Sequence, residues 1–412
     1  MAFYPGYRFL KINSFHIYVR DGFLEQVAQS RLLDLCRRLF CGTQAELIKQ
    51  GTYKTIFKTE IDGAACLVKQ YRNPGFFKQL KSLVKPARAR FEFQAAVHID
   101  GCGIETPVPF LLAEDKRAGM VRAGIVVLPF LTGAVELKDL FFGGYPCRSA
   151  EKRHILEQFG RLTAKIFSSA VFQYDYSINN FMLRSEGGRQ RLYFIDFERV
   201  TTGKPVVMQQ RCNLLAKLNR IGREVSLTDR LRFLRSYLAE DSGFAGSLKE
   251  GVGLLGDEMV AVLKRDLQRG RLSSIYTHHG YTKFRQDGFA GFSKKGYELA
   301  GMIDHLTGLS GEVGTSEISV VAGGQQHRLR AVCLRAEDAR AAWARLSLLV
   351  IAGMPLELPD VLAEDGRRGF ICAAPEFFSR LTKTADQTCG SVAFVRKNFP
   401  GLIDEALSAL SV

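Results

Sequence analysis

The sequence predicts an α+β protein in which a strand-rich region is followed by a helical region and then by a second strand-rich region. Three runs with strand-like patterns follow one another at 45–49, 54–60 and 64–71. Helical periodicity then dominates 149–169 and 226–272. Part of the first region's pattern returns near the C-terminus, which indicates a repeated sheet unit.

Length and composition limit the class of protein. The chain has 412 residues, of which 46% are hydrophobic and 24% charged, so it can bury a large core and form two or three domains. The net charge of +15 indicates anionic partners, such as a nucleotide, a phosphosugar, an acidic lipid or a nucleic acid. The nine cysteines are dispersed without a C-x-x-C pair, which favours reduced thiols in a cytoplasm. We expect neither a signal peptide nor a membrane span.

The first strand-rich region begins with 7–20, whose alternating pattern predicts one or two strands. Lys69 ends the third of the strand runs, where a surface lysine is the ordinary interpretation. Gly51 lies in the first connecting turn and can bring backbone N–H groups close to a phosphate, although a plain β-turn fits the same residues. Glu92, the only acidic residue of the next predicted helix before Asp100, is the natural partner for Lys69.

A predicted hairpin carries the strongest chemical signal. Two strand-like runs, 180–184 and 191–195, are separated by a turn that contains two glycines. Asp175 precedes the first run and Asp196 follows the second, so we expect Asp175, Asn180 and Asp196 to lie close together. Oxygen ligands of this kind suit Mg²⁺, which fills its coordination sphere with water and phosphate oxygens. The hairpin therefore predicts phosphoryl transfer.

The spacing narrows the class further. Asp175 and Asn180 stand as D-x-x-x-x-N, and Asp196-Phe197-Glu198 follows an apolar strand, in the order of a kinase catalytic loop and metal-binding triplet. Over roughly residues 40–225 the chain resembles the protein-kinase-like superfamily. Within it the chain is most similar to the bacterial lipopolysaccharide core kinases, which phosphorylate heptose or Kdo sugars. The resemblance implies a two-lobed fold and the use of ATP and Mg²⁺.

The resemblance also implies roles for single residues. Asp175 is then the general base, Asn180 and Asp196 hold the metal, and Lys69 and Glu92 form the ion pair of the upper lobe.

The nucleotide site follows from the same resemblance. The apolar run 124–130 resembles the hinge between the lobes, where Leu128 and Phe130 lie beside the adenine. Gly51 and Lys69 then lie beside the phosphates.

Two residues depart from the kinase pattern. Gln173 stands where a histidine usually precedes the catalytic aspartate, and Glu198 stands where the metal triplet usually ends in glycine. Sugar and small-molecule kinases commonly vary the second of these positions, so Glu198 argues against a regulated protein kinase more than against activity.

A basic segment lies between Lys69 and Glu92 and contains no acidic residue. Lys78, Lys81 and Lys85 alternate there with apolar residues at helical spacing, which predicts a short amphipathic helix able to rest on an anionic bilayer. A core-packing helix with a solvated face is the alternative.

The C-terminal region repeats part of the first. The residues that recur 250 positions further along the chain are Gly103, Pro109, Leu112–Asp115, Arg117 and Gly119. Residue Ala342 matches Glu92, and no D-x-x-x-x-N follows, so this copy is predicted to be catalytically inert. Chance similarity of strand and turn patterns is the alternative.

The predicted organisation has three parts. Residues 1–131 form a kinase-like N-lobe with an N-terminal extension, and residues 132–275 form a helical C-lobe with the catalytic and metal-binding loops. Residues 276–412 form a degenerate N-lobe-like α+β domain.

The leading functional hypothesis is an ATP-dependent kinase that phosphorylates a heptose or Kdo hydroxyl of the lipopolysaccharide inner core. The enzyme is expected in the cytoplasm, peripherally bound to the inner membrane. Two alternatives remain: a protein or small-molecule kinase of the same fold, and a pseudokinase or scaffold that binds nucleotide or lipid. A nucleic-acid partner is not expected, because the basic residues lack interleaved base-stacking motifs. The oligomeric state stays open.

Overall fold

The structure is a computed structural model. It describes residues 4–27, 29–42, 45–73, 75–141, 147–218, 225–241, 243–268, 281–294, 297–309, 314–322, 325–351, 361–365, 367–374, 376–377 and 401–410. The side chains of some residues within helices and strands, including Lys78 and Lys81, lie outside this description. The chain divides into two compact units, which comprise Met1–Leu214 with Thr228–Gly251 and Leu215–Leu227 with Val252–Val412.

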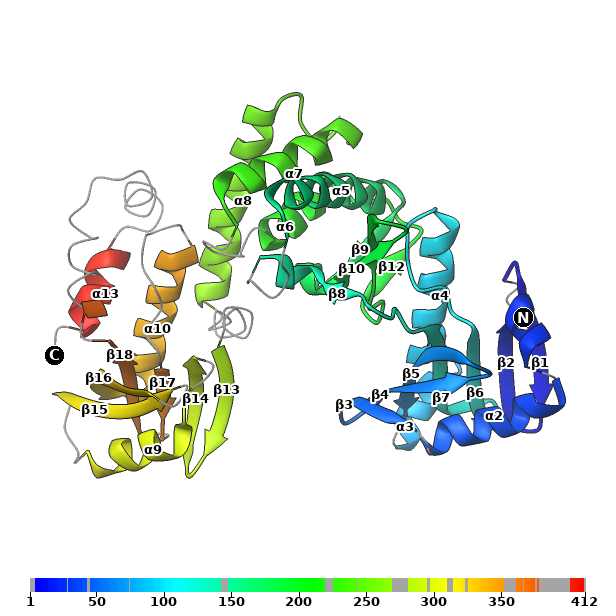
Figure 1. Ribbon diagram of the computed structural model, residues 1–412, viewed down its shortest axis with the longest axis horizontal. Helices are drawn as coiled ribbons and strands as arrows, with labels where there is room; N and C mark the ends of the chain where they lie inside the picture. Colours follow the sequence, from blue (N-terminus) through cyan, green and yellow to red (C-terminus); the bar gives the residue numbers. More distant parts are fainter. Residues whose placement is uncertain are drawn as a thin grey trace. The chain divides into compact units, whose positions relative to one another are not determined.

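The first unit begins with a seven-stranded antiparallel sheet (Figure 1). In spatial order its strands are β1 (Tyr7–Ile12), β2 (Phe15–Arg20), β6 (Leu111–Arg117), β7 (Met120–Pro129), β5 (Ala64–Arg72), β4 (Lys54–Ile61) and β3 (Glu46–Gln50). All four strand predictions for this region are confirmed, and 7–20 forms two strands rather than one.

Helices cover both faces of this sheet, because side chains alternate between the faces along each strand. On one face, α2 (Gln29–Cys41) packs against apolar residues such as Val68, while α1 (Asp21–Gln26) adds Phe23. On the other face, α4 (Arg88–Gly101) packs through Ala89 and Phe93. Lys69 belongs to this second face, beneath the helix that carries Glu92. A short helix, α3 (Phe76–Lys81), precedes α4.

The helical region follows the sheet. Its helices are η1 (Leu137–Leu140), α5 (Ser149–Ser168), η2 (Ile178–Asn180), α6 (Met208–Leu218), α7 (Leu227–Glu240) and α8 (Leu248–Gln268). Its short strands are β8 (Val135–Glu136), β9 (Val171–Gln173), β10 (Phe181–Glu186), β11 (Arg189–Phe194) and β12 (Val200–Thr202). Helix α5 supports the predicted hairpin directly, because the ring of Phe159 lies 4.8 Å from that of Phe181 at the start of β10.

The second unit contains a six-stranded antiparallel sheet. Its spatial order is β13 (Tyr281–Gln286), β14 (Phe289–Lys294), β17 (Val361–Glu364), β18 (Arg368–Ala373), β16 (Gln325–Arg335) and β15 (Gly314–Ala322). One face packs on α9 (Leu299–Gly308). The other packs on α10 (Ala336–Ile351) and on α13 (Leu402–Leu410).

The two sheets share one topology. Read along each sheet, β13, β14, β17, β18, β16 and β15 hold the places of β1, β2, β6, β7, β5 and β4. The predicted fold class, a kinase-like α+β fold followed by a degenerate N-lobe-like α+β domain, is therefore confirmed.

The pairing register equates single positions in the two sheets. Lys69 on β5 pairs with Val126, and Val332 on β16 pairs with Ile371. Because Val126 and Ile371 pair with matching residues of β6 and β17, Val332 holds the position of Lys69.

Two glycines equate the helices in the same way. Gly124 lies beneath Ala89 of α4, and Gly369 lies beneath Ala339 of α10. Glu92 follows Ala89 by one turn of α4, and Ala342 follows Ala339 by one turn of α10. Ala342 therefore holds the position of Glu92.

One match in the sequence comparison is wrong. Counting 250 positions paired Gly369 with Gly119, but the register places Gly369 at the position of Gly124. Nine residues separate the paired Glu114 and Gly124, but four separate the paired Glu364 and Gly369, so the second hairpin is shorter and a constant offset fails beyond its turn.

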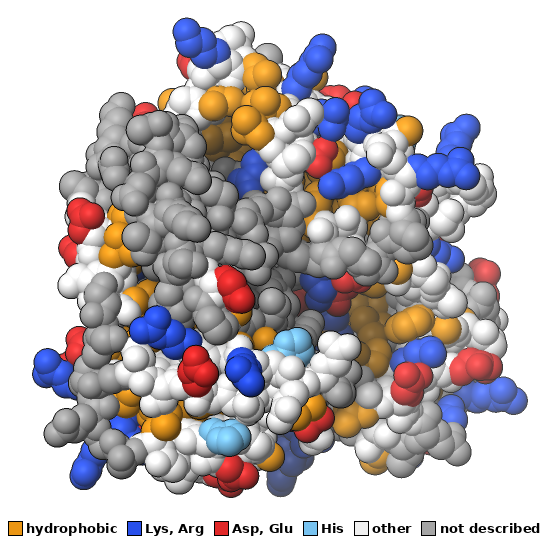
Figure 2. Space-filling view, turned by 60° about the vertical axis from the view of Figure 1, so that its left-hand side comes forward, with side chains coloured by type: hydrophobic (Ala, Val, Ile, Leu, Met, Phe, Trp, Pro, Cys, Tyr) orange, Lys and Arg blue, Asp and Glu red, His pale blue; other side chains and the backbone are white. Residues whose placement is uncertain are grey.

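The surface agrees with the composition. On the face shown in Figure 2, Lys and Arg side chains are distributed widely, with Asp and Glu side chains between them. Among the described helices, none combines the length and apolar character that crossing a bilayer requires.

Candidate active site

The hairpin of β10 and β11 sets the geometry of the site. The two strands pair antiparallel, with Phe181 opposite Phe194 at the open end. The backbone N–H of Ile195 donates a hydrogen bond to the carbonyl oxygen of Asn180 at 2.8 Å, which continues the pairing by one step. Asn180 and Asp196 therefore leave the hairpin at the same end.

Asp196 lies between two lysines. Its Oδ1 is 3.6 Å from Nζ of Lys69 and 3.6 Å from Nζ of Lys54. Its φ of 64° is left-handed, a conformation that aspartate tolerates better than most residues. Burial raises the pKa of Asp196, but the two ammonium groups outweigh burial and bring the pKa below its ordinary value. The carboxylate is thus ionised at neutral pH.

Lys69 belongs to a buried polar group beneath α4. Its ammonium pairs with Glu92, and the hydroxyl of Tyr71 contacts the other oxygen of that carboxylate. The same hydroxyl lies 3.1 Å from Oε1 of Glu198. Burial acts to lower the pKa of Lys69, but Glu92 and Asp196 outweigh burial and raise it, so the ammonium stays charged.

Asp175 follows β9 and is half exposed, at 52% of its side chain. The amide Nδ2 of Asn180 donates a hydrogen bond to the backbone oxygen of Asp175 at 3.3 Å, which joins these two predicted residues. Burial raises the pKa of the Asp175 carboxyl above its ordinary value, while Arg199, 3.9 Å away, acts in the opposite sense. A raised pKa suits a group that accepts a proton during turnover.

Gln173, the last residue of β9, connects this strand to the loop that carries Asp196. It is buried, and its Nε2 donates a hydrogen bond to the backbone oxygen of Asp196 at 2.6 Å. The residue that departs from the kinase pattern therefore holds the backbone of Asp196 in place.

The predicted nucleotide residues lie on the upper sheet. The N–H of Gly51 donates to the carbonyl oxygen of Lys54 at 2.8 Å, which closes the turn between β3 and β4. The side chain of Leu128 is buried in the cluster that contains Tyr71. Phe130 follows β7, and its N–H donates to Ala65 at 2.9 Å.

Sequence reasoning missed three residues of the site. Lys54 and Tyr71 were read only as strand residues, and Glu198 only as a departure from glycine. Lys54 contacts the carboxylate of Glu198, so these three side chains form one group with the predicted residues. The sequence signal that could have found Lys54 is strand register. A hairpin pairing of β4 with β5 places Lys54 opposite Tyr71, on the same face as Lys69.

The donor set fits a magnesium ion better than a soft metal. Asp196 offers an ionised carboxylate and Asn180 an amide oxygen, and Mg²⁺ takes few protein ligands beside substrate phosphates. Among the described residues, no three or more His, Cys, Asp or Glu side chains gather as a metal cluster.

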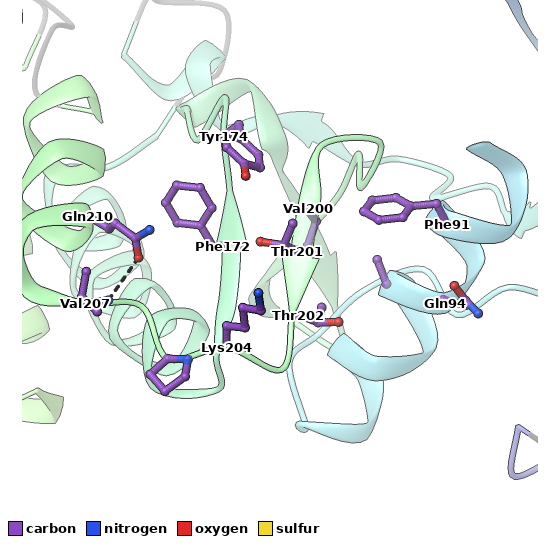
Figure 3. Close-up of a pocket in the computed structure, with 12 residues that line it drawn as sticks. Phe91, Gln94, Phe172, Tyr174, Val200, Thr201, Thr202, Lys204, Val207 and Gln210 are labelled. Carbon is purple, nitrogen blue, oxygen red and sulfur yellow. Dashed lines mark hydrogen bonds between the residues drawn. The ribbon is translucent and has the colours of Figure 1, made fainter. Parts of the chain in front are cut away.

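A pocket of about 480 Å³ adjoins the catalytic loop, between α4 and the strands β9 and β12 (Figure 3). The aromatic rings of Phe172 and Tyr174 line one side, with centroids 4.8 Å apart. Figure 3 shows the side chain of Lys204 reaching into this space beside Thr201. The pocket thus combines aromatic faces, hydroxyl groups and one cation.

A buried lysine and glutamate pair beside an aspartate on a hairpin loop is the arrangement found in kinase-like phosphotransferases. Residues 38–237 match the model of the lipopolysaccharide kinase (Kdo/WaaP) family. This part of the chain is similar to the kinases of that family, which identifies the protein as a kinase.

Two further comparisons accompany the family match. A solved structure described as WaaP in complex with acyl carrier protein is similar at 21% sequence identity and a TM-score of 0.46, and the match covers 60% of this chain and 98% of that chain. None of the curated protein sequences matches the chain.

Proposed function

We propose that this kinase transfers a phosphoryl group from ATP to a sugar hydroxyl of the lipopolysaccharide inner core, on heptose or Kdo. The observation that carries the proposal is the buried pair of Lys69 and Glu92 with Asp196 beside it. The acceptor would meet the enzyme at the cytoplasmic face of the inner membrane, which fits a chain with a net charge of +15.

Each catalytic residue has a role in this proposal. Asp175 orients the acceptor hydroxyl and accepts its proton, and Lys69, held by Glu92, binds nucleotide phosphates. Asn180 and Asp196 hold Mg²⁺. The ion, when bound, neutralises charge on the phosphate oxygens.

The nucleotide would lie along the upper sheet. Leu128 and Phe130, at the end of β7, flank the adenine, and Gly51 lies above the phosphates.

We assign the acceptor sugar to the pocket of Figure 3. Tyr174 is the chain neighbour of Asp175, and its backbone N–H donates to the carbonyl oxygen of Arg199 at 3.1 Å. Tyr174 is 55% exposed, so we expect its ring to offer a sugar an aromatic face to pack on. Lys204 supplies a cation for an acidic sugar or a neighbouring phosphate. Tyr174→Ala should raise KM for the acceptor and leave KM for ATP unchanged.

A membrane surface is the proposed setting for the reaction. Phe76, Leu80, Leu83 and Val84 are exposed around α3, at 62%, 42%, 55% and 86% respectively. Exposed apolar side chains in a basic segment suit an interfacial position. The side chains of Lys78 and Lys81 lie outside the described residues.

The membrane proposal has a direct test. Replacing Lys78, Lys81 and Lys85 by Glu should release the protein from anionic vesicles, because each basic residue near such a surface contributes about 1 kcal/mol. If the fraction of protein that co-sediments with the vesicles changes neither in this variant nor with added salt, the assignment is contradicted.

The proposed domains are 1–131, 132–275 and 276–412, with the last one catalytically inert. Helix α8 supplies Met259, Val262 and Leu263 to the core of the second unit. A chain ended near Gly270 leaves these side chains uncovered, so it should be poorly soluble or lose acceptor phosphorylation. If it phosphorylates at the full-length rate, the C-terminal domain is only an accessory module.

The central experiment measures ATP consumption with and without de-acylated lipopolysaccharide at matched Mg²⁺. Asp196→Ala should abolish binding of Mg-ATP. Asp175→Asn should leave binding intact and slow turnover roughly 10²- to 10⁴-fold, because a general base contributes about that much. Turnover of Asp175→Asn equal to the wild type would show that Asp175 is not the general base, and no turnover in the wild type would leave the role of a nucleotide-binding scaffold.

A further inference from the structure

Lys54 is a basic residue of the site to which neither the kinase pattern nor the family match gives a role. It is the first residue of β4, immediately after the turn that Gly51 closes. Kinases that cover phosphates with a glycine-rich loop use the backbone N–H groups of that loop. Here the N–H of Gly51 is already bonded to the carbonyl oxygen of Lys54 at 2.8 Å, so it is not free for a phosphate.

The pairing register places Lys54 on the catalytic face of the sheet. Lys54 lies opposite Tyr71, and Ile56 lies opposite Lys69. Paired residues on antiparallel strands point to the same face, and so do alternate residues along a strand. Lys54 and Lys69 therefore extend from neighbouring strands on the same side, above Asp196.

The charges show what holds Lys54 there. Its ammonium contacts the carboxylate of Glu198 and lies 3.6 Å from Oδ1 of Asp196, and it lies 5.8 Å from the ring centroid of Tyr71. Lys54 is also the more accessible of the two lysines, with 21% of its side chain exposed against 7% for Lys69. An accessible ammonium beside the metal-loop aspartate is placed to meet an anionic ligand.

We propose that Lys54 binds phosphate oxygens of the nucleotide as a second cation beside Lys69, and that Glu198 positions Lys54 for this contact. The inference rests on the proposed function, since it assumes that nucleotide phosphates lie near Asp196. It gives Glu198 a purpose at the position where other kinases carry glycine. A carboxylate there reaches Lys54 and the hydroxyl of Tyr71 together, which a glycine cannot do.

The competing explanation is structural. Lys54 and Glu198 come from the upper sheet and the metal loop, so their ion pair can simply join these two elements. A purely structural pair affects thermal stability and the binding of every ligand alike. A phosphate contact affects only ligands that carry phosphates.

The test compares Lys54→Met with Lys11→Met, which removes an exposed lysine of β1 in the same sheet. Dissociation constants of the full-length protein for Mg-ATP, Mg-ADP and adenosine are measured by calorimetry, together with thermal unfolding without nucleotide. Lys54→Met should weaken Mg-ATP about tenfold to a hundredfold, the range of one charge-assisted contact, and leave adenosine unchanged. Lys54→Arg should restore much of the affinity, and Lys11→Met should bind all three ligands like the wild type.

Glu198→Gln tests the positioning role. It should weaken Mg-ATP less than Lys54→Met does, and the double variant should be no weaker than Lys54→Met alone, because both changes remove one contact. Wild-type affinity for Mg-ATP in Lys54→Met overturns the inference and leaves the proposed function standing. Equal weakening of adenosine and Mg-ATP shows a structural pair and also overturns it. Failure of the wild type to bind Mg-ATP at all contradicts the proposed function itself.

Discussion

The two sheets share their strand order and helix positions but differ in the chemistry of a single face. In the first unit, Lys69 and Tyr71 of the sheet and Glu92 of α4 form a buried polar group between the sheet and the helix. In the second unit, the equivalent positions are Val332 of the sheet and Ala342 of α10, both fully buried. The same framework therefore supports a charged site in one copy and an apolar core in the other.

The covering elements explain why the second face is apolar. In the second unit, α8 and α13 pack on the face beneath α10. They supply buried residues to its core, such as Met259 from α8 and Leu402 and Ala406 from α13. Burial of an unpaired ammonium in such a core is unfavourable. Among the described residues, apolar side chains of the covering helices therefore close this face, which does not favour a buried cation.

The connection before the helix differs too. In the second unit, α10 begins at Ala336, directly after β16. In the first unit, residues 73–87 separate β5 from α4 and include α3 with its exposed apolar side chains. The segment that we assign to the membrane is therefore an addition specific to the kinase sheet.

The largest effect should come from giving the first sheet the residue of the second. Lys69→Val should lower kcat/KM by at least about a hundredfold, because it removes a phosphate contact and leaves the carboxylate of Glu92 buried without its cation. Val332→Ala is the matched change in the second sheet and should leave the affinity for Mg-ATP unchanged. Steady-state kinetics and calorimetry on both variants check this, and equal losses would contradict the contrast between the faces.

The reverse change should destabilise the second unit. Val332→Lys places an unpaired ammonium in the closed core and should lower the free energy of unfolding by roughly 3–5 kcal/mol. Adding Ala342→Glu gives the lysine a partner at the equivalent of Glu92 and should recover part of this loss. Chemical denaturation measures both. A double variant less stable than Val332→Lys would show that the two positions do not meet.

Much of the fold followed from sequence because the signals were local. The hairpin that separates Asn180 from Asp196 has two strand-like runs and a turn with two glycines, and each feature acts over a few residues. The repeat was visible because Leu112–Asp115 recurs as Leu362–Asp365 within the same strand.

The remainder depended on contacts between distant segments. The hydrogen bond of Gln173 to the backbone of Asp196 spans 23 positions, and that of Tyr71 to Glu198 spans 127. A glutamine or a tyrosine in a sequence does not indicate which distant residue it will contact. The contact between Lys54 and Glu198 depends on the register of β4 and β5, because a shift of one residue would turn Lys54 to the opposite face.

Two glycines offer a smaller and closely matched comparison. A Cβ added at Gly124 would lie 2.7 Å from that of Ala89, and one added at Gly369 would lie 2.3 Å from that of Ala339. Either substitution to Ala should push its helix from the sheet and cost about 1–3 kcal/mol of stability, the usual range for overpacking. Only Gly124→Ala should also weaken Mg-ATP, because α4 carries Glu92. Weakened Mg-ATP in Gly369→Ala would show that the second sheet affects the site.

The smallest expected effect is a shift in the pH profile of the enzyme. It concerns the first unit, which carries the predicted catalytic loop. A general base must be deprotonated, so kcat/KM should rise with pH through the pKa of Asp175. Burial raises that pKa, and Arg199 lowers it by favouring the carboxylate, so Arg199→Ala should raise it further. The acid limb of the pH profile should therefore move by a small amount to higher pH. Arg161→Ala, a change at an exposed arginine of α5 that pairs with Glu157, should leave the limb in place. A limb that stays fixed or moves to lower pH in Arg199→Ala would show that the titrating group is not Asp175.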